Sequence, residues 1–523
     1  MPDTAPEALT DLLAALEVER GDDTWVVAPD GEHTFASMWE VARRVAHGLR
    51  DRGVREGDVV ALFLRNGVAF LEGWFGAVTL GAVAVPVNTG FKHDEARYVL
   101  EHSDAVVCVV DAATSPIVRA LEGSLPNLKH VFDIDHTGAT PFEHLTGSPA
   151  LEPEEVPRLA AEAPAGILYT SGTTGPPKGC LLGHDYYLEV PRSFASHLEL
   201  TRDDVLLCVL PLFHMNAQTL SVLGSLTVGA RLILEERFKA STFWDTVRTH
   251  RVTEINYLGV ISSVLYKQPP TPHDRDHDVR VGFGAGIPAE IHEPFEQRFG
   301  FPMIEVFGMT ETGFDLGVPL RGERRVGSRT IGKPVPGKEA RVIAEDGGDA
   351  SPDEPGDLVI RGPALFKGYY KDPDATREAL TDDGWFRTGD LAKRGPDGWY
   401  YYVDRRKDLL RRAGENISSV EVETVIKRHP DVYEVAVIGA PDDVVGQEVM
   451  AVVVARPEVT PDGELAESIM RSCEERLSSF KVPRYVRFVE GLPRTRSEKI
   501  QKHHLRELYG MPDGAFERTW RPQ

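Results

Sequence analysis

The chain has 523 residues, with 81 Asp and Glu against 58 Lys and Arg, so the formal net charge is −23. At ~150 residues per domain this length predicts two to four domains with a large buried core. Hydrophobic residues make up 41% of the chain, which excludes whole-chain disorder. The acidic balance argues against a nucleic-acid-binding protein, which needs clustered Lys and Arg.

The N-terminal part of the chain alternates short apolar runs with helical patterns. Apolar runs of this kind between helices are typical of buried parallel strands in an α/β fold. We expect helices at 68–80 and 116–122, and strands at 59–64, 82–87, 106–110, 205–210, 230–234 and 254–258.

The pattern changes after about Gly327. Gly and Pro now separate short strands at 339–343 and 357–361, which predicts a smaller, mostly antiparallel subdomain. A compact αβ pattern follows from about Asp408, so we place a domain boundary near residues 404–408. In this last part we expect helices at 419–428 and 464–477 and strands at 434–438 and 448–454. The predicted fold is α/β: a large N-terminal domain of layered α/β subdomains with a β-rich subdomain, then a smaller α+β C-terminal domain.

The four cysteines lie far apart and form no CxxC pair: Cys108, Cys180, Cys208 and Cys473. This spacing argues against a disulfide scaffold or a zinc knuckle and favours a reducing compartment. The first residues contain no basic stretch followed by an apolar run, so we expect no signal peptide. No apolar run approaches the ~18 residues of a membrane-spanning helix. We therefore expect a cytoplasmic protein without stable membrane insertion and without a nucleic-acid partner.

The strongest local motif is the stretch YTSGTTGPPKG at 169–179, which follows the apolar run 165–168. Its glycines let the backbone approach an anion closely, its hydroxyls can donate hydrogen bonds, and Lys178 adds a positive charge. It is not a Walker A loop, because Pro177 and Gly179 flank Lys178 where that motif needs Gly and Ser or Thr. A phosphate-binding loop and a flexible surface loop both fit this composition.

The same stretch resembles the phosphate loop of the adenylate-forming superfamily: acyl- and aryl-CoA synthetases, luciferases and the adenylation domains of peptide synthetases. Further segments similar to that family follow in the family's order and extend the resemblance over residues 34–506. They are PLFH at 211–214, GAGIP at 284–288, FGMTE at 307–311, GWFRTGD at 384–390, DRRKD at 404–408, GENIS at 414–418 and PRTRSEK at 493–499. Acyl- and aryl-CoA ligases are the members that the chain resembles most.

The resemblance implies an acid–thiol ligase that uses ATP, Mg²⁺ and coenzyme A. The acid would first form an acyl-adenylate and then a thioester, with release of AMP and pyrophosphate. One alternative is the same scaffold delivering the acid to a carrier protein or to a non-thiol nucleophile, an amine or, diazotase-like, nitrite. Another is a non-catalytic regulator that binds a nucleotide or an acyl group, although Lys499, Glu311 and Asp390 together speak against it. Fatty, aryl and cinnamate-like acids all stay open as the substrate, and so does a homodimer as the assembly.

The resemblance also implies roles for single residues. Lys499 would bridge the attacking carboxylate and the α-phosphate. Glu311 and Thr170 would hold Mg²⁺, Thr310 would contact the α-phosphate, and His214 would lie near the acyl carboxylate. The implied ATP-binding residues are Thr170, Ser171, Gly172, Thr173, Thr174, Gly175, Lys178, Gly284, Ala285, Gly286, Phe307, Asp390 and Arg405.

The remaining implied roles concern movement and the acid. Residues 1–404 would bind ATP and the acid, 405–408 would form a hinge around Asp408, and 409–523 would be a mobile lid that carries Gly414 to the thiol tunnel. The implied acyl pocket contains Asn216, Tyr257 and Gly259. Met215 stands where amino-acid-activating domains carry Asp, which argues against an amino-acid substrate. The chain departs from the family pattern at Glu498, where Gly is usual, and at Ser419, where Pro is common.

Overall fold

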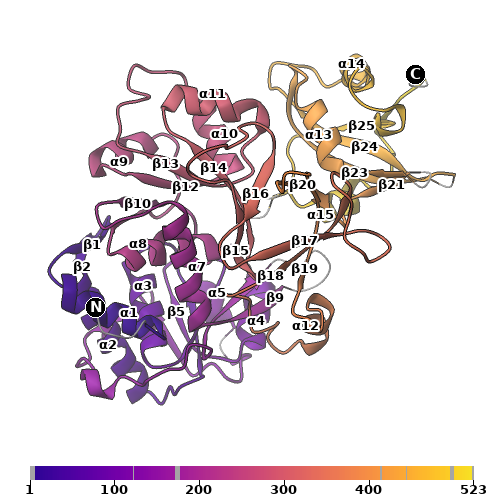
Figure 1. Cartoon of the computed structure of the whole chain (residues 1–523). Coiled ribbons are helices and arrows are strands. Elements are labelled where there is room, and N and C mark those ends of the chain that lie inside the picture. Colours follow the sequence, from indigo (N-terminus) through magenta and orange to yellow (C-terminus); the bar gives the residue numbers. More distant parts are fainter. Residues whose placement is uncertain are drawn as a thin grey trace. The chain divides into compact units, whose positions relative to one another are not determined.

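The computed structural model describes residues 6–121, 123–170, 177–412, 415–442, 444–494 and 500–520. The chain forms two compact units (Figure 1). Unit 1 consists of Met1–Ala340 and Ile360–Phe386, and unit 2 of Arg341–Val359 and Arg387–Gln523. The predicted α/β fold with a large N-terminal and a smaller C-terminal part is confirmed. The predicted hinge at 405–408 stays a prediction, because compactness in one conformation does not reveal where the chain bends.

The first sheet of unit 1 has seven strands in the order β7-β6-β5-β3-β4-β8-β9. All neighbours are parallel except β8 and β9, which pair antiparallel. Apolar residues of β3, β4 and β5 pack with those of α4 and α5 in one buried cluster. The strands are β3 (Val59–Phe63), β4 (Val83–Pro86), β5 (Ala105–Val110), β6 (His130–Asp133), β7 (Thr140–Pro141), β8 (Pro164–Thr170) and β9 (Lys178–Gly183).

The second sheet of unit 1 runs in the order β16-β15-β14-β13-β12-β10-β11-β1-β2. Its centre, from β11 to β14, is parallel, so the carboxyl ends of these strands meet at one edge, where ligands bind in open α/β sheets. The strands are β1 (Thr24–Ala28), β2 (Gly31–Thr34), β10 (Val205–Cys208), β11 (Arg231–Leu234), β12 (Glu254–Leu258), β13 (Val281–Ala285), β14 (Met303–Met309), β15 (Gly313–Gly317) and β16 (Thr330–Pro334).

The helices of unit 1 connect these strands (Figure 1). They are α1 (Leu9–Arg20), α2 (Phe35–Asp51), α3 (Val68–Thr79), α4 (His93–His102), α5 (Ser115–Ala120), α6 (Glu143–Thr146), α7 (His184–His197), α8 (Leu223–Val228), α9 (Phe243–His250), α10 (Gly259–Lys267), α11 (Ala289–Phe299) and α12 (Pro373–Ala379). A short 3₁₀ turn, η1 (Pro153–Glu155), and a π-helical segment, η2 (Asn216–Val222), complete the unit. No described helix is both long enough and apolar enough to cross a lipid bilayer.

Unit 2 contains two groups of strands. The first has the order β17-β18-β19-β20, with β17 (Glu339–Ile343), β18 (Pro355–Arg361), β19 (Phe386–Arg394) and β20 (Tyr400–Arg405). The second has the order β22-β21-β24-β25-β26, and β23 also pairs with β24. These strands are β21 (Leu410–Arg412), β22 (Glu415–Ile417), β23 (Val432–Asp442), β24 (Gly446–Ala455), β25 (Tyr485–Phe488) and β26 (Phe516–Glu517). The helices are α13 (Ser419–Ile426), α14 (Gly463–Glu474), η3 (Ser479–Lys481) and α15 (Lys502–Tyr509).

Most predicted elements are confirmed with small shifts at their ends. The strands predicted at 254–258 and 339–343 coincide with β12 and β17, and the helix predicted at 68–80 is α3. The strand predicted at 205–210 ends earlier, at Cys208. Pro211 follows closely and has no N–H to donate to a neighbouring strand, which favours an early end.

Candidate functional site

The predicted phosphate loop joins the ends of two antiparallel strands, β8 and β9. Thr170 lies opposite Lys178 in their register, and the Thr170 hydroxyl donates to the Lys178 carbonyl oxygen over 3.4 Å. The hairpin therefore determines where the loop begins and ends, with the half-buried Lys178 at its exit. The predicted phosphate-binding residues that lie outside the described residues are Ser171, Gly172, Thr173, Thr174 and Gly175.

Thr310 and Glu311 lie in the short connection between β14 and β15, which also includes Thr312. Gly313 follows at φ 79°, a left-handed conformation that glycine adopts without steric cost and that short hairpin loops require. A Cβ atom at Gly308 would lie only 2.2 Å from the Gly313 carbonyl oxygen. The two glycines therefore allow a tight turn, which presents Thr310 half-buried and leaves Glu311 only 6% exposed.

The hydrogen bonds to Glu311 come from neutral groups. Its Oε1 accepts a 3.0 Å hydrogen bond from the Tyr369 hydroxyl, and the Glu311 carbonyl oxygen accepts one from the Phe366 amide over 2.8 Å. Burial, and then the negative charge of Glu311, raise the pKa of the Cys180 thiol and of the Tyr369 hydroxyl. Both groups therefore stay protonated beside this carboxylate.

This carboxylate fits one way of binding Mg²⁺. Among the described residues, no cluster of three or more His, Cys, Asp or Glu side chains could enclose a metal ion. Mg²⁺ at nucleotide sites is usually held by one or two carboxylates together with the phosphates of the substrate. Glu311 can supply such a carboxylate, and Thr170, the other predicted ligand, ends β8. Glu311 and Thr170 therefore suit a cation that arrives bound to a nucleotide.

Three residues in register connect β12, β13 and β14: Tyr257, Gly284 and Glu305. Because Gly284 has no side chain, the Tyr257 ring can extend across β13, and its hydroxyl donates to Glu305 Oε1 over 2.7 Å. A Cβ atom at Gly284 would lie 2.9 Å from Tyr257 Cγ and 2.0 Å from the Tyr257 carbonyl oxygen. Glycine is therefore required at this position for steric reasons.

Glu305 also holds the segment that we predicted to flank adenine. Its carboxylate oxygens accept hydrogen bonds from the backbone amides of Gly286 at 3.1 Å and Ile287 at 3.0 Å. Burial raises the pKa of Glu305, whereas the hydrogen bonds from Tyr257 and from the two amides lower it. Sequence reasoning missed Glu305, although an acidic residue within the apolar run of β14 was a signal.

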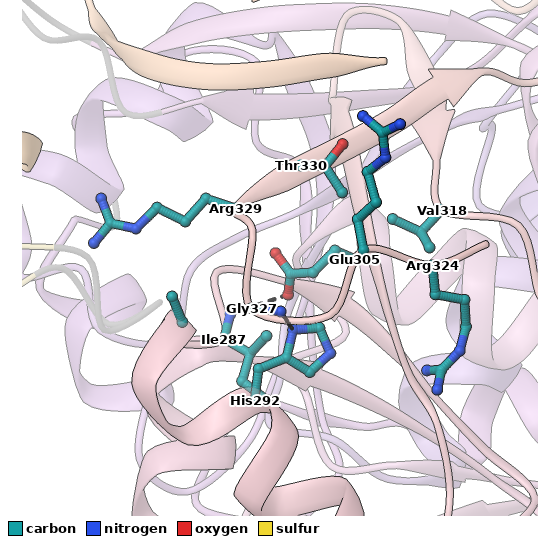
Figure 2. Close-up of a pocket in the computed structure, with 10 residues that line it drawn as sticks. Ile287, His292, Glu305, Val318, Arg324, Gly327, Arg329 and Thr330 are labelled. Atoms are coloured by element: carbon teal, nitrogen blue, oxygen red, sulfur yellow. Dashed lines mark hydrogen bonds between the residues drawn. The ribbon is translucent and has the colours of Figure 1, made fainter. Parts of the chain in front are cut away.

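The predicted adenine-binding residues lie at the carboxyl ends of β13 and β14. Ala285 and Gly286 are exposed at the end of β13, and Phe307, 9% exposed, lies near the end of β14. Exposed backbone next to an aromatic ring can accommodate a planar base. Figure 2 shows a cavity in the same region, with the Glu305 carboxylate bonded to Ile287. The cavity has room for about one water molecule, which is too little for a nucleotide.

The residues predicted to contact the acid begin in the PLFH loop. Asn66 fixes this loop: its Oδ1 accepts from the Leu212 amide over 2.8 Å, and its Nδ2 donates to the Leu210 carbonyl oxygen over 2.9 Å. The half-buried His214 ring lies tilted against the Phe213 ring, with 4.5 Å between the ring centroids. Asn216 then begins the π-helical segment η2, and such segments are frequent at functional sites.

The other acyl-pocket candidates lie at the end of β12. Gly259 packs so tightly that a Cβ atom there would lie 2.0 Å from the Gly286 carbonyl oxygen. Tyr257 is fully buried, and its hydroxyl is used by Glu305, so its place in an acyl pocket stays a prediction. Asn256, on the other face of the strand, donates from Nδ2 to the Ser221 hydroxyl over 3.0 Å.

Unit 2 contains the predicted ribose-binding pair. Asp390 and Arg405 are register partners on β19 and β20, and Arg405 Nε lies 3.2 Å from Asp390 Oδ1. Gly389, at φ 71°, precedes Asp390, whose amide donates to the Thr388 hydroxyl over 3.1 Å. This turn determines the direction of Asp390, which is 3% exposed.

Unit 2 also contains the predicted hinge and lid residues. Asp408 accepts a hydrogen bond from Arg506 Nη2 over 2.7 Å, and the buried Asp404 accepts from both the amide and the hydroxyl of Ser419, each over 2.7 Å. Arg494 and Ile500 pair as an isolated bridge. The predicted catalytic Lys499 and the predicted tunnel residue Gly414 lie outside the described residues.

Two family models match the chain. One, described as AMP-binding enzyme, matches residues 15–370, and the other, AMP-binding enzyme C-terminal domain, matches residues 421–499. Among named relatives, the sulfoacetate–CoA ligase of Cupriavidus necator is 34% identical over 513 residues, covering 96% of this chain and 98% of that protein. The crotonobetaine/carnitine–CoA ligase of Salmonella arizonae is 35% identical over 487 residues, covering 90% and 93%.

Solved structures agree with these matches. The ATP-bound MatB of Rhodopseudomonas palustris aligns with a TM-score of 0.87 at 29% identity, over 96% of this chain and 99% of that one. The anthranilate CoA ligase AuaEII in complex with anthranoyl-AMP aligns with a TM-score of 0.88 at 28% identity, over 96% and 98%.

Proposed function

Because this chain belongs to the AMP-binding enzyme family, we propose that it is an ATP-dependent ligase that joins a carboxylic acid to coenzyme A through an acyl-adenylate. In the first step a carboxylate oxygen bonds to the α-phosphorus of ATP, and the bond from that phosphorus to the β-phosphate oxygen breaks. Pyrophosphate leaves. In the second step the deprotonated sulfur of coenzyme A bonds to the acyl carbon, and the acyl–oxygen bond to AMP breaks.

One observation carries this proposal: the buried Glu311 carboxylate and the Lys178 ammonium lie on two different hairpins and both contact Tyr369. A carboxylate can hold the Mg²⁺ that accompanies ATP, and an ammonium can neutralise phosphate oxygens. Substitution at phosphorus depends mostly on positioning and on electrostatic stabilisation. Glu311 supplies a negative charge for Mg²⁺, and Lys178 supplies a positive charge for the phosphates.

Other residues would bind the nucleotide and the reacting groups. Asp390 has two carboxylate oxygens, which suit the two ribose hydroxyls. Lys499 would stabilise the negative charge that develops between the acid and the α-phosphate. Mg²⁺, when bound through Glu311 and Thr170, would neutralise phosphate charge.

We also propose the hinge at 405–408, between a domain of residues 1–404 and a lid of residues 409–523 that contains Gly414. With a hinge there, the hydrogen bonds from Ser419 to Asp404 join its two sides. Rotation would break them, so they would stabilise one of the two conformations. Arg506 belongs to the proposed lid, so its hydrogen bond to Asp408 joins the lid to the hinge.

The acid itself is proposed to be small and polar. The Oδ1 atom of Asn216 is buried without a hydrogen-bond partner among the described residues, and such an atom favours a polar acyl group over a long alkyl chain. The names of the two relatives, sulfoacetate and crotonobetaine/carnitine ligase, refer to acids of this kind.

Pyrophosphate release with a panel of acids tests the proposal. Small polar, aryl and long-chain fatty acids are each supplied with ATP and Mg²⁺, with and without coenzyme A, and acyl-CoA is measured by mass spectrometry. We expect release to depend on the acid and acyl-CoA to form. Release without acyl-CoA formation would favour a carrier protein or a non-thiol acceptor, and no release with any acid would favour a regulator.

Lys499→Ala tests the first step separately. We expect it to abolish adenylation and to spare thioester formation from supplied acyl-adenylate. Lys427→Ala, which removes an exposed lysine elsewhere in unit 2, is the matched control. Equal loss of both half-reactions in Lys499→Ala would contradict the role of Lys499.

A further inference from the structure

Tyr369 lies in a segment that is bound to the edge of β9. The Lys367 amide donates to the Leu181 carbonyl oxygen over 2.7 Å, the Leu181 amide returns a 3.0 Å bond to Gly368, and the Tyr370 amide donates to Gly179 over 2.7 Å. The segment therefore lies along the edge of β9, where Tyr369 and Cys180 form an isolated antiparallel bridge. Its backbone position does not depend on the Tyr369 side chain.

Two further contacts fix Tyr369 itself. Its amide donates to the Thr376 hydroxyl over 2.9 Å, and the Phe366 ring lies against its ring at 4.9 Å between centroids, edge to face. Phe366 also donates its amide to the carbonyl oxygen of Glu311. The phenol is therefore held in one orientation by partners that need neither Lys178 nor the Glu311 carboxylate.

The fixed phenol contacts two side chains of opposite charge. Its hydroxyl donates to Glu311 Oε1 over 3.0 Å, and the Lys178 Nζ lies 4.9 Å from the centroid of its ring. Lys178 and Glu311 form no ion pair with each other in the part of the chain that the structure describes. An ammonium over an aromatic face is attracted to it without losing its charge.

We propose that Tyr369 is a positioning residue that keeps the Glu311 carboxylate and the Lys178 ammonium apart and orients both for a nucleotide with its metal ion. The hydrogen bond from Tyr369 engages Oε1 of Glu311 and not Oε2, so the carboxylate keeps an oxygen to offer a cation. The ring attracts Lys178 away from the carboxylate. A direct ion pair would cancel the two charges that the phosphates and the metal need. This inference rests on the proposed function for what the two charges bind.

Three substitutions separate the two contacts. Tyr369→Phe removes the hydroxyl and keeps the ring, and Tyr369→Leu removes both. Tyr370→Phe is the matched control: it removes the neighbouring hydroxyl, which bonds to Asp104 over 3.4 Å and contacts neither charge. Thermal unfolding of each variant reports whether it folds.

The measurement is ATP binding by calorimetry, once with excess Mg²⁺ and once with EDTA. For Tyr369→Phe we expect binding with Mg²⁺ to weaken about 10- to 100-fold, the usual cost of losing a partner that orients a metal ligand. Binding in EDTA should change less than about twofold, since the cation–ring contact is kept. Tyr369→Leu should weaken binding in both conditions, and Tyr370→Phe in neither.

The outcomes distinguish the inference from the proposed function. A folded Tyr369→Phe variant with an unchanged ratio between the two conditions overturns the inference, while wild-type protein that binds no ATP overturns the proposed function with it. If Tyr369→Phe does not fold, the Glu311→Gln variant replaces it in the same comparison. Tyr369→Leu is then combined with Glu311→Gln. The double variant should lose no more Mg²⁺-dependent ATP binding than Glu311→Gln alone, and a larger loss contradicts the role of Tyr369.

Discussion

Two buried glutamates in the second sheet of unit 1 have opposite surroundings. Glu305 on β14 accepts hydrogen bonds from the Tyr257 hydroxyl and from two backbone amides. Glu254 on β12 is fully buried, and neither of its oxygens has a hydrogen-bond partner among the described residues. Burial raises the pKa of both, that of Glu254 well above its usual value, and only Glu305 has hydrogen bonds that oppose the shift.

The comparison shows what a buried carboxyl group can do in the same sheet. With three donors, Glu305 links β14 to Tyr257 on β12 and to the backbone that follows β13. Without donors, Glu254 is kept protonated by burial, because an unpaired buried charge is very costly. Glu305 is therefore expected to support the nucleotide site, and Glu254 to be a neutral part of the core.

The largest effect is expected at Gly284, because the Tyr257 ring reaches Glu305 only across this residue without a side chain. Gly284→Ala places a Cβ atom 2.0 Å from the Tyr257 carbonyl oxygen, so the strand or the ring must move. We expect a loss of about 3 kcal/mol or more in unfolding free energy, as for severe overpacking, together with weaker ATP binding. Urea unfolding measures the first and calorimetry the second.

Gly491→Ala is the control for this substitution, because no atom lies within 4 Å of the added Cβ. It should change stability by less than about 0.5 kcal/mol, as surface substitutions usually do. A Gly284→Ala protein as stable as this control would show that the row from Tyr257 to Glu305 is not sterically tight.

The next effect concerns the acceptor itself. Glu305→Gln replaces one accepting oxygen with an amino group, so at least one of the donors from Tyr257, Gly286 and Ile287 loses its partner. We expect a loss of about 2–3 kcal/mol, the cost of an unsatisfied buried polar group beside a lost charged acceptor. Chemical unfolding at neutral pH measures it. If Glu305→Gln is instead neutral or stabilising, Glu305 resembles Glu254 and the distinction fails.

A smaller effect is expected from removing one donor. Tyr257→Phe keeps the ring across Gly284 and leaves Glu305 its two backbone amides. We expect a loss of about 1–2 kcal/mol, the value of one hydrogen bond to a charged group. The same unfolding experiment measures it, and a loss larger than that of Glu305→Gln would mean that the ring, not the carboxylate, is the main support.

At about pH 5 the smallest effect is expected at Glu254, with the opposite sign. Its pKa in the folded state lies well above the unfolded value of about 4.5. Above that pH the unfolded chain loses a proton that the folded chain keeps, so stability falls as pH rises. Glu254→Gln removes this loss. The variant should gain on the wild type by up to about 1.4 kcal/mol per pH unit, or about 1 kcal/mol near pH 5.

Unfolding of both proteins at several pH values between 4 and 7 measures this difference. At about pH 4 the two proteins should be equally sensitive to pH, because the Glu254 carboxyl group is mostly protonated in both the folded and the unfolded chain. A difference that stays constant over the whole range would show that Glu254 ionises in the folded protein, and the contrast with Glu305 would disappear.

The sequence was sufficient for several of the strands and for the location of the motifs. Bounded apolar runs predicted β12 and β17 at their observed ends. The resemblance to a known family identified the turn with Thr310 and Glu311, and the structure adds the reason for its shape in Gly308 and Gly313.

The contacts that support the site could not be predicted in the same way. Tyr369 is 58 positions from Glu311, and Tyr257 is 48 positions from Glu305. Each pair meets only through the register of several strands, and the second also requires that Gly284 has no side chain. Such conditions belong to the folded sheet and leave no local pattern in the sequence. The roles of Lys499 and Gly414 stay predictions, because both residues lie outside the described part of the chain.

The products of a single turnover test the central claim most directly. Wild-type protein is mixed with ATP, Mg²⁺ and an accepted acid without coenzyme A, and the mixture is analysed by mass spectrometry before and after coenzyme A is added. The account predicts acyl-adenylate and pyrophosphate first, then loss of the adenylate with formation of acyl-CoA and AMP. Formation of ADP and phosphate, with no adenylate at any time, would contradict it.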